Sequence, residues 1–211
     1  MFPERVDIPW APQVAPRKHR EIPADLMTLL TRHGAVEDLA DGLLNTFGLQ
    51  SFVNFPPTAR ATRDFGVRAG RVLTVLHVPR RNREADDRKG HEIVASAVQP
   101  GDIVVIDARG CQGITIGGNK TRLLVSAGAA ACVLDGAARD YDEIELPTVA
   151  TGWQIEAGRR YAELCSVGGI INFRGTAVHP DDVALVNSWG MTLIPAQLSW
   201  EQVATLLKKR K

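Results

Sequence analysis

The feature that most constrains the fold is a series of short apolar segments, each bounded by glycine, proline or aspartate. The clearest segments are residues 70–78, 103–107 and 131–134. Runs this short and this rich in β-branched residues predict buried strands, because buried helices are usually about ten residues or longer. No run approaches the roughly 18 apolar residues that a membrane-spanning helix requires, so we expect no membrane segment and no membrane partner.

Apolar residues also recur with helical spacing between these strands. Residues 24–44 predict two amphipathic helices broken at Gly34. Further helices are expected over residues 91–98, 120–130 and 200–209. Because strands and helices mix without strict strand–helix–strand alternation, the pattern favours a layered α/β fold over a dinucleotide-binding sheet.

Turn residues mark where several elements should end. Asp135-Gly136 predicts a turn that closes the strand over residues 131–134. Residues 98–110 are similar to residues 178–190, with proline, aspartate, strand and closing glycine in the same register. Two interpretations stay open for that similarity: unrelated turn–strand–turn units, or equivalent strands in one sandwich or barrel.

The length and the prolines indicate one domain behind an irregular arm. The chain has 211 residues, and prolines punctuate residues 1–23, where we expect a surface arm without regular structure. Residues 24–211 then form a single domain. The arm carries no apolar signal segment, and the three cysteines include no Cys-x-x-Cys pair. A disulfide framework is therefore not expected, and a cytoplasmic location is the default.

Charge gives no reason to expect nucleic acid as a partner. The formal net charge is +1, which is far from the basic balance of most nucleic-acid-binding domains. The densest basic cluster, residues 80–83, is followed at once by Glu84, Asp86 and Asp87. We therefore expect residues 80–89 to form an exposed, solvated loop rather than a binding patch.

The chemically dense stretch runs from Ile116 to Asp142. Gly117-Gly118-Asn119 leads into a predicted helix, whose first N–H groups and positive dipole end can hold a carboxylate or phosphate. Arg139-Asp140 adds an arginine suited to paired hydrogen bonds with a carboxylate and an aspartate suited to Mg²⁺ or Mn²⁺. The alternatives are an ordinary helix cap and an ordinary surface ion pair.

Residues 117–140 resemble a known family pattern: Gly-x-x-x, a helix, then Gly-x-x-Gly-Val-Val-x-Asp-Gly-x-x-Arg-Asp. This pattern is typical of the RraA-like proteins, which include 4-hydroxy-4-methyl-2-oxoglutarate aldolases, oxaloacetate decarboxylases and the RraA regulators of ribonuclease E. The resemblance covers roughly residues 39–195. Supporting similarities lie in residues 68–75, 100–107 and 146–152.

The resemblance implies a fold, a reaction and an assembly. The fold would be a layered β/β/α sandwich-barrel, similar to the phosphohistidine-swivelling domain. The reaction would be metal-dependent cleavage or decarboxylation of a short 2-keto acid or diacid through a pyruvate enolate. A non-catalytic, protein-binding regulator is the alternative. The assembly would be a homotrimer or a hexamer, with pockets at subunit interfaces.

The resemblance also implies residue roles. Backbone N–H groups of Gly117, Gly118, Asn119 and Lys120 would hold the substrate carboxylate. Arg139 would hold the keto acid and stabilise the enolate, and Asp140 would bind Mg²⁺ or Mn²⁺. Stabilising developing negative charge in this way is how a metal and an arginine accelerate such reactions.

The chain departs from the family pattern in three places, one of which is Phe173-Arg174-Gly175 in place of the usual Val-Pro-Val. The family usually has Gly-Glu-Leu after the first glycine, whereas this chain has Gly118-Asn119-Lys120. An acidic residue near the end of the pattern is replaced by Asn187. These departures favour an altered substrate preference. Two histidines are assigned no catalytic role: we expect His77 to be a hydrogen-bonded core or rim residue and His91 to be a helix cap or surface residue.

Overall fold

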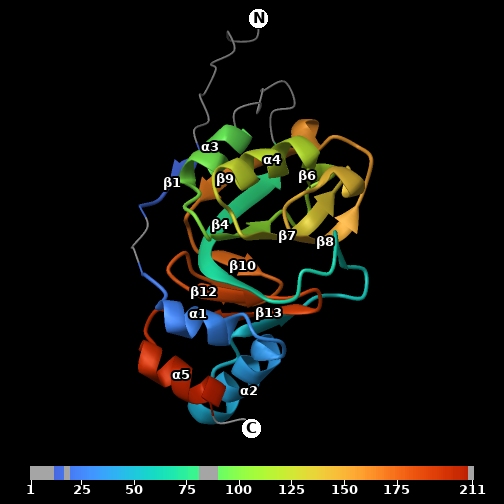
Figure 1. Ribbon diagram of the computed structural model, residues 1–211. Coiled ribbons are helices and arrows are strands. Elements are labelled where there is room, and N and C mark those ends of the chain that lie inside the picture. The colour runs from blue at the N-terminus through green and yellow to red at the C-terminus, as the bar shows by residue number, and fades with distance from the viewer. Residues whose placement is uncertain (1–11, 17–19, 81–89, 209–211) are drawn as a thin grey trace, which may run out of the picture.

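The computed structural model describes residues 12–16, 20–80 and 90–208. These residues stack in four layers: helices, a parallel sheet, a second β layer and further helices (Figure 1). The helices are α1 (Ala24–Leu30), α2 (Ala35–Phe47), α3 (Gly90–Ala97), α4 (Gly118–Ser126) and α5 (Trp200–Lys208), with short 3-10 turns at η1 (Tyr141–Glu143) and η2 (Gly158–Arg160). The strands are β1 (Gln13–Val14), β2 (Phe52–Asn54), β3 (Arg60–Ala61), β4 (Arg68–Pro79), β5 (Ile103–Asp107), β6 (Ile114–Ile116), β7 (Ala131–Ala138), β8 (Thr148–Trp153), β9 (Ala162–Val167), β10 (Ile171–Phe173), β11 (Thr176–Val178), β12 (Val183–Val186) and β13 (Gly190–Ile194).

The strands follow one path, β2-β13-β12-β4-β5-β7-β8-β3, with β9 attached to β4 and β6 attached to β7. At its centre β4, β5, β7 and β8 run parallel. Helices α3 and α4 cover one face of these parallel strands (Figure 1). The antiparallel strands β12, β13 and β2 form the second layer, and α1, α2 and α5 cover its outer face.

Three apolar cores separate the four layers. Leu73 of β4 belongs to the core under α3 and α4, together with Val94. The neighbouring Val72 belongs to the core between the two β layers. Successive residues of a strand point to opposite faces, so one apolar strand contributes to both cores. Leu185 of β12 and Leu39 of α2 belong to the third core, beneath the outer helices.

Strand β4 joins the two β layers because it changes partner along its length. Residues 68–71 pair with β12, and residues 72–76 pair with β5. Gly70 lies just before this change. A Cβ atom there would lie 2.0 Å from the carbonyl oxygen of Gly101, a distance that no side chain can tolerate. Gly70 is therefore required for the turn before β5 to pack against β4.

The structure confirms the mixed α/β class and the layered arrangement expected from the sequence. The break between the first two helices is also confirmed, and Gly34 there adopts the left-handed conformation with φ 79°. The centre of the sheet alternates strands and helices more strictly than expected. Helix α3 lies in the connection between the parallel strands β4 and β5, and helix α4 lies in the connection between the parallel strands β5 and β7.

The two similar segments contain strands β5 and β12, which lie on either side of β4. Strand β5 runs parallel to β4, and β12 runs antiparallel to it. Each begins with a buried aspartate that accepts a backbone hydrogen bond from three residues earlier. The Gln99 N–H donates to Asp102 Oδ2 at 2.8 Å, and the His179 N–H donates to Asp182 Oδ2 at 3.1 Å. The two segments therefore share a turn–strand unit, but their opposite directions relative to β4 do not support equivalent positions in the sheet.

Three local expectations are wrong. Asp135-Gly136 does not end a strand: β7 continues to Ala138, with a register shift against β8 at this point. The Gly136 N–H donates to Thr151 Oγ1, which keeps the backbone extended. Residues 13–14 of the arm form strand β1 because they pair with the free edge of β9. Arg80 is buried and donates from Nε to the Ala162 carbonyl, while residues 81–89 of the expected loop lie outside the described residues.

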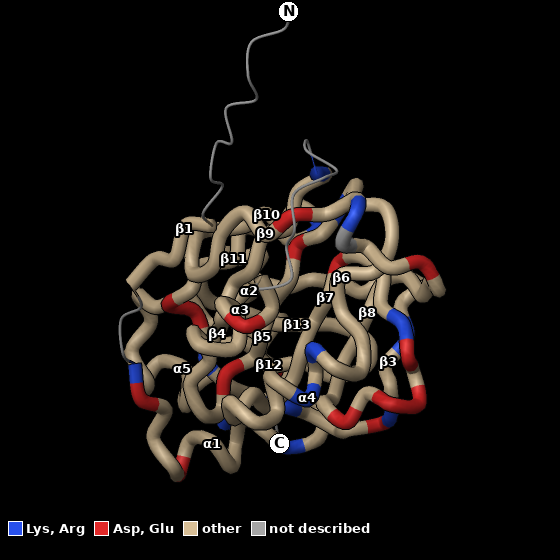
Figure 2. The backbone as a smooth tube through the Cα atoms, turned by 90° about the horizontal axis from the view of Figure 1, so that it is seen from above, with Lys and Arg blue, Asp and Glu red and all other residues tan. Residues whose placement is uncertain are grey.

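Charged residues of both signs are interspersed over the described chain (Figure 2), in keeping with the net charge of +1. A mixed distribution of this kind produces no field of a single sign. In the part of the chain that the structure describes, every helix is too short or too polar to cross a bilayer.

We expect Gly70→Ala to lower the free energy of unfolding by about 2 kcal/mol, because overpacking against backbone forces strands β4 and β5 apart. Urea denaturation followed by circular dichroism measures this change. Gly169→Ala is the matched control, since a Cβ atom there meets only Ser166, with its Oγ at 3.5 Å and its Cβ at 3.9 Å. Equal stability of the two variants would contradict the packing argument.

Candidate functional site

The pairing of β6 with the end of β7 brings the two sequence-predicted features together. The strands are parallel, with Ile116 paired to Ala138. Helix α4 begins directly after β6, and Arg139-Asp140 directly follow β7. Because parallel strands end at the same edge, the start of α4 meets the arginine and the aspartate there.

Glycine permits the close contact between these two segments. The Gly118 N–H donates to Asp140 Oδ2 at 3.2 Å, and the Arg139 N–H donates to the Ile116 carbonyl at 3.2 Å. A Cβ atom at Gly117 would lie 2.8 Å from Asp140 Oδ2, and one at Gly118 would lie 3.0 Å from Glu143. Larger residues at either position would push the acidic segment away from the helix.

Asp140 has an unusual backbone that directs its carboxylate toward α4. Its φ is 57°, in the left-handed region that aspartate tolerates better than most residues. Its carbonyl accepts a hydrogen bond from the Glu143 N–H at 2.9 Å, which starts the η1 turn. Arg139 Nε lies 3.5 Å from Asp140 Oδ2, and about a third of each side chain is exposed (40% and 34%).

Both residues open into a cavity of about 290 Å³. Its walls come from the carboxyl ends of β4, β6 and β7 and from the amino ends of α3 and α4. The lining residues are His77, His91, Ile114, Thr115, Gly117, Asn119, Lys120, Arg139, Asp140, Gly158 and Ala162. The cavity thus brings together nearly all of the predicted site positions. The remaining one, Gly118, contacts the site through its N–H.

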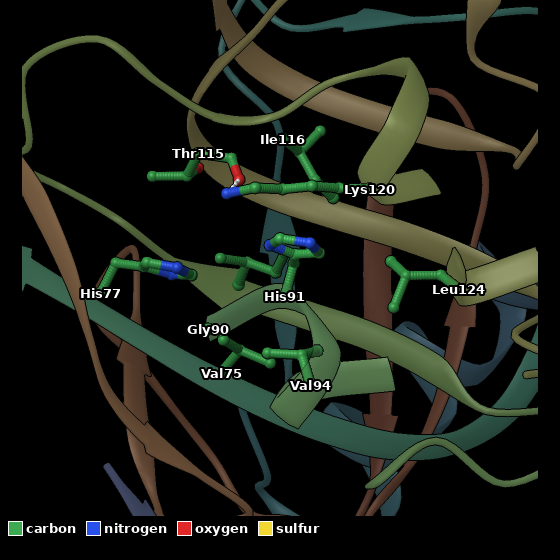
Figure 3. Close-up of a pocket in the computed structure, with 10 residues that line it drawn as sticks. Val75, His77, Gly90, His91, Val94, Thr115, Ile116, Lys120 and Leu124 are labelled. Atoms are coloured by element: carbon green, nitrogen blue, oxygen red, sulfur yellow. Dashed lines mark hydrogen bonds between the residues drawn. The ribbon is translucent and has the colours of Figure 1, made fainter. Parts of the chain in front are cut away.

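A smaller pocket of about 20 Å³ extends the cavity inward (Figure 3). His77, His91, Thr115 and Lys120 line both spaces. The inner wall is apolar and consists of Val75, Val94, Ile106, Ile116 and Leu124.

Unpaired buried polar atoms concentrate in this cavity. Within the described part of the chain, five buried side-chain polar atoms have no hydrogen-bond partner. Three of them are His77 Nδ1, Thr115 Oγ1 and Arg139 Nε, all on residues that line the cavity. Leaving a buried polar group unpaired costs about 1–3 kcal/mol. Such a concentration is typical of a site whose partners are supplied by a bound molecule.

His77 is a neutral imidazole in this setting. It is only 9% exposed, and burial together with the positive charge of Lys120 lowers its pKa to about 3. The expectation of a hydrogen-bonded core histidine is therefore wrong for Nδ1. His91 lies in the first turn of α3 and lines the cavity rather than the outer surface.

The side chains at the start of α4 have separate partners. Lys120 Nζ donates to the Thr115 carbonyl at 2.8 Å, inside the cavity. Asn119 Oδ1 accepts a hydrogen bond from Arg122, which also pairs with Glu143 at 3.0 Å. Glu143 does not line the cavity, and Asp140 is the one carboxylate among the described residues that do.

The donor set is small for a metal centre. Among the described residues, no group of three or more histidine, cysteine, aspartate and glutamate side chains could hold an ion. Magnesium nevertheless binds through one or two carboxylates and keeps several waters. Asp140 Oδ2 accepts the Gly118 N–H, and the side chain stays 34% exposed at the cavity. This arrangement fits a hydrated Mg²⁺ or Mn²⁺ rather than a fully protein-bound ion.

Sequence reasoning missed the inner residues of the cavity. His77, His91 and Thr115 belong to no recognised motif, and the main role expected of Lys120 was through its backbone N–H, with a Schiff base at its side chain left as an option. A usable signal was the position of His77 near the end of an apolar strand, since ligands of parallel sheets bind at the carboxyl ends of the strands.

Solved structures with the same fold support the architecture. One described as novel cellulases from microbes of the gut ecosystem has a TM-score of 0.77 at 17% identity, covering 92% of this chain and 87% of that one. An uncharacterized protein from Pseudomonas syringae pv. tomato has a TM-score of 0.71 at 19% identity, covering 89% and 88%. Streptomyces coelicolor RraAS2, from the RNase ES inhibitor RraA family, has a TM-score of 0.69 at 19% identity, and the match covers 90% of this chain and 92% of that one. At these identities the likeness concerns the fold alone.

No curated protein matches the chain. The model of the RraA-like family, described as Aldolase/RraA, matches residues 36–192. The match includes the start of α4, the Arg139-Asp140 pair and every strand from β2 to β12. This match covers well over half of the sequence, and the chain therefore belongs to the RraA-like family.

Proposed function

We propose that the protein is a divalent-metal-dependent carbon–carbon lyase that cleaves or decarboxylates a short 2-keto acid through a pyruvate enolate. The observation that carries the proposal is the meeting of Arg139, Asp140 and the start of α4 in one cavity. Two further buried polar atoms of the cavity, His77 Nδ1 and Thr115 Oγ1, have no hydrogen-bond partner among the described residues, which supports a bound partner there.

The chain's own residues account for binding and orientation. The N-terminus of α4 presents backbone N–H groups and the positive end of the helix dipole to a carboxylate. The Arg139 guanidinium can bind the keto acid and then the enolate oxygen, which gains negative charge as the carbon–carbon bond breaks. In oxaloacetate, CO₂ would leave from C4, and the electron pair would form the enolate that takes a proton at C3.

Asp140 is the residue that would hold the Mg²⁺ or Mn²⁺ ion, with water completing the coordination. When bound, the ion supplies a Lewis acid that polarises the keto oxygen. The proposed setting is cytoplasmic, with a small keto acid as the partner.

The alternative is a non-catalytic regulator that binds other proteins, and its support is the fold shared with Streptomyces coelicolor RraAS2, a member of the RNase ES inhibitor family. Pyruvate release from oxaloacetate, with Mg²⁺ or Mn²⁺ and with a chelator, separates the two functions. A protein-free sample with the same metal corrects for spontaneous decarboxylation. Absence of turnover on both oxaloacetate and 4-hydroxy-4-methyl-2-oxoglutarate would favour the regulator.

We expect Arg139→Gln to lower kcat/KM at least about 100-fold, the usual loss when a donor to a developing oxyanion is removed. Steady-state kinetics on oxaloacetate measures the change. Arg122→Gln is the matched control, because it removes a positive charge from the neighbouring surface of α4, where Arg122 pairs with Glu143. If the two variants lose the same activity, general charge rather than contact with the substrate is responsible.

For Asp140→Asn we expect turnover that no longer responds to added Mg²⁺ or Mn²⁺. The amide oxygen preserves the acceptor for the Gly118 N–H, and asparagine tolerates the left-handed backbone, so the fold should remain. Calorimetric titration with Mn²⁺ measures loss of the ion directly. Wild-type metal binding in this variant would remove Asp140 from its proposed role.

The oligomeric state, a homotrimer or a hexamer, stays a prediction, and an exposed apolar residue beside the site supports it. Ile155 is 94% exposed and lines an open groove with Arg139, Tyr141 and Trp153. Contiguous exposed apolar surface marks interaction sites, and Tyr141, which is 42% exposed, extends the apolar surface of Ile155 in this groove. We expect Ile155→Asp to shift the assembly toward monomers in sedimentation velocity, whereas Ile170→Asp, on the loop before β10, should not. An unchanged sedimentation profile for Ile155→Asp would place the interface elsewhere.

A further inference from the structure

We propose that Arg174, in the turn of the β10–β11 hairpin, is a positioning residue: through β7 it sets the direction of Arg139 and Asp140. The inference adds a residue from a different part of the fold, since Arg174 does not line the cavity. Its consequence for catalysis rests on the proposed function, whereas the positioning itself can be measured without any activity.

Arg174 and Asp140 share an unusual backbone conformation. Among the described residues other than glycine, two have a positive φ: Arg174, at 51°, and Asp140, at 57°. Such a backbone persists where surrounding contacts hold it, and it is frequent at functional sites. At Arg174 the turn supplies one of these contacts, because the Gly175 N–H donates to Asn172 Oδ1 at 2.8 Å. The arginine therefore leaves a fixed turn.

Three hydrogen bonds connect this turn to β7. Arg174 Nη1 donates to Asp135 Oδ1 at 2.8 Å, and the Thr151 hydroxyl donates to the same oxygen at 3.1 Å. The Thr151 hydroxyl in turn accepts the Gly136 N–H at 2.9 Å. These bonds fasten β7 at the place where its pairing with β8 shifts register.

The register shift decides where the end of β7 leads. Irregularities of this kind bend a strand and re-aim the residues that follow. Beyond the shift, the end of β7 pairs with β6, and the Arg139 N–H donates to the Ile116 carbonyl at 3.2 Å. The Asp140 carboxylate then accepts the Gly118 N–H at 3.2 Å. A change at Asp135 therefore reaches both site residues through a short piece of strand.

Arg174 is needed because two buried carboxylates lie side by side. Asp107 and Asp135 are paired in register, and their side chains are 8% and 4% exposed. Arg109 contacts both, at 3.0 Å and 3.4 Å, but Asp135 Oδ2 accepts no hydrogen bond from the described residues. Without Arg174, Arg109 alone among them would have to balance both charges, which is strongly unfavourable. Asp135 would then turn toward solvent or take up a proton, and its bond with Thr151 would weaken.

The amide resonance of Gly118 in nuclear magnetic resonance spectra of the isotope-labelled, full-length protein tests the positioning directly. This N–H reports the place of the Asp140 carboxylate, to which it donates. We expect Arg174→Met and Thr151→Val each to move the amide proton upfield, because a charge-assisted hydrogen bond is weakened. Arg174→Lys keeps a cation for Asp135 and should bring the resonance back toward its wild-type position.

Arg32→Met is the matched control. Arg32 pairs with Asp38 in the outer helical layer and is 32% exposed, close to the 34% of Arg174. This control should leave the Gly118 resonance unchanged even if it lowers stability, and circular dichroism verifies that each variant is folded. An unchanged resonance in Arg174→Met, or the same change in the control, would overturn the inference whatever the activity of the protein.

Steady-state kinetics on oxaloacetate with Mn²⁺ shows what the positioning contributes to turnover. The start of α4 can still hold the substrate carboxylate in Arg174→Met, so we expect kcat to fall at least about tenfold and KM to stay within about twofold. Adding Thr151→Val should lower kcat by no more than about twofold further, because both residues act through one connection.

The kinetic outcomes separate this inference from the proposed function. An unchanged kcat in Arg174→Met would overturn its positioning role in catalysis, and multiplied losses in the double variant would overturn the route through Thr151. Absence of turnover in wild-type protein would contradict the proposed function instead, and the Gly118 resonance would still decide whether Arg174 positions the end of β7.

Discussion

The site depends on the contact between the start of α4 and the residues that follow β7. The Gly118 N–H donates to the Asp140 carboxylate, and neither Gly117 nor Gly118 has room for a Cβ atom. Parallel pairing of β6 with β7 delivers both segments to the same edge. Without this approach Arg139 and Asp140 would be an ordinary surface pair, and the cavity would lose one wall. Two glycines and one short strand pairing therefore turn a common dipeptide into part of an enclosed site.

Buried polar groups divide the carboxyl edge of the sheet into two regions with different properties. Asp107 at the end of β5 and Asp135 within β7 are paired in register and are neutralised by Arg109 and Arg174. Arg109 also donates to the Asn172 carbonyl, which ties the β10–β11 hairpin to the sheet. Such a charge-balanced network suits a structural role, because removing one partner would leave a buried charge.

The cavity beside Arg139 has the opposite character. Among the described lining residues the cationic side chains outnumber the one carboxylate, and His77 and Thr115 each retain a buried polar atom without a hydrogen bond. Folding alone gains nothing from such an arrangement, since each unpaired atom costs free energy. A ligand that supplies the missing acceptors explains the cavity better than packing does. This local chemistry is the basis of the proposal that the cavity binds a small anion.

Local patterns in the sequence were sufficient for the outer part of this site and for most elements. The helices around Gly34 and the strand over residues 103–107 follow from spacing and composition, because these signals lie within a few residues of one another. The roles proposed for Arg139 and Asp140 came from the resemblance to the RraA-like pattern. The Asp135-Gly136 prediction was wrong because a hydrogen bond to Thr151, a residue of the neighbouring strand, keeps the backbone extended. The residues of the inner wall of the cavity could not be predicted from the sequence for a related reason. His77, Thr115 and Lys120 meet only because β4, β6 and α4 are placed side by side by sheet pairing and core packing, and a strand's periodicity shows which face is buried but not which strand lies beside it.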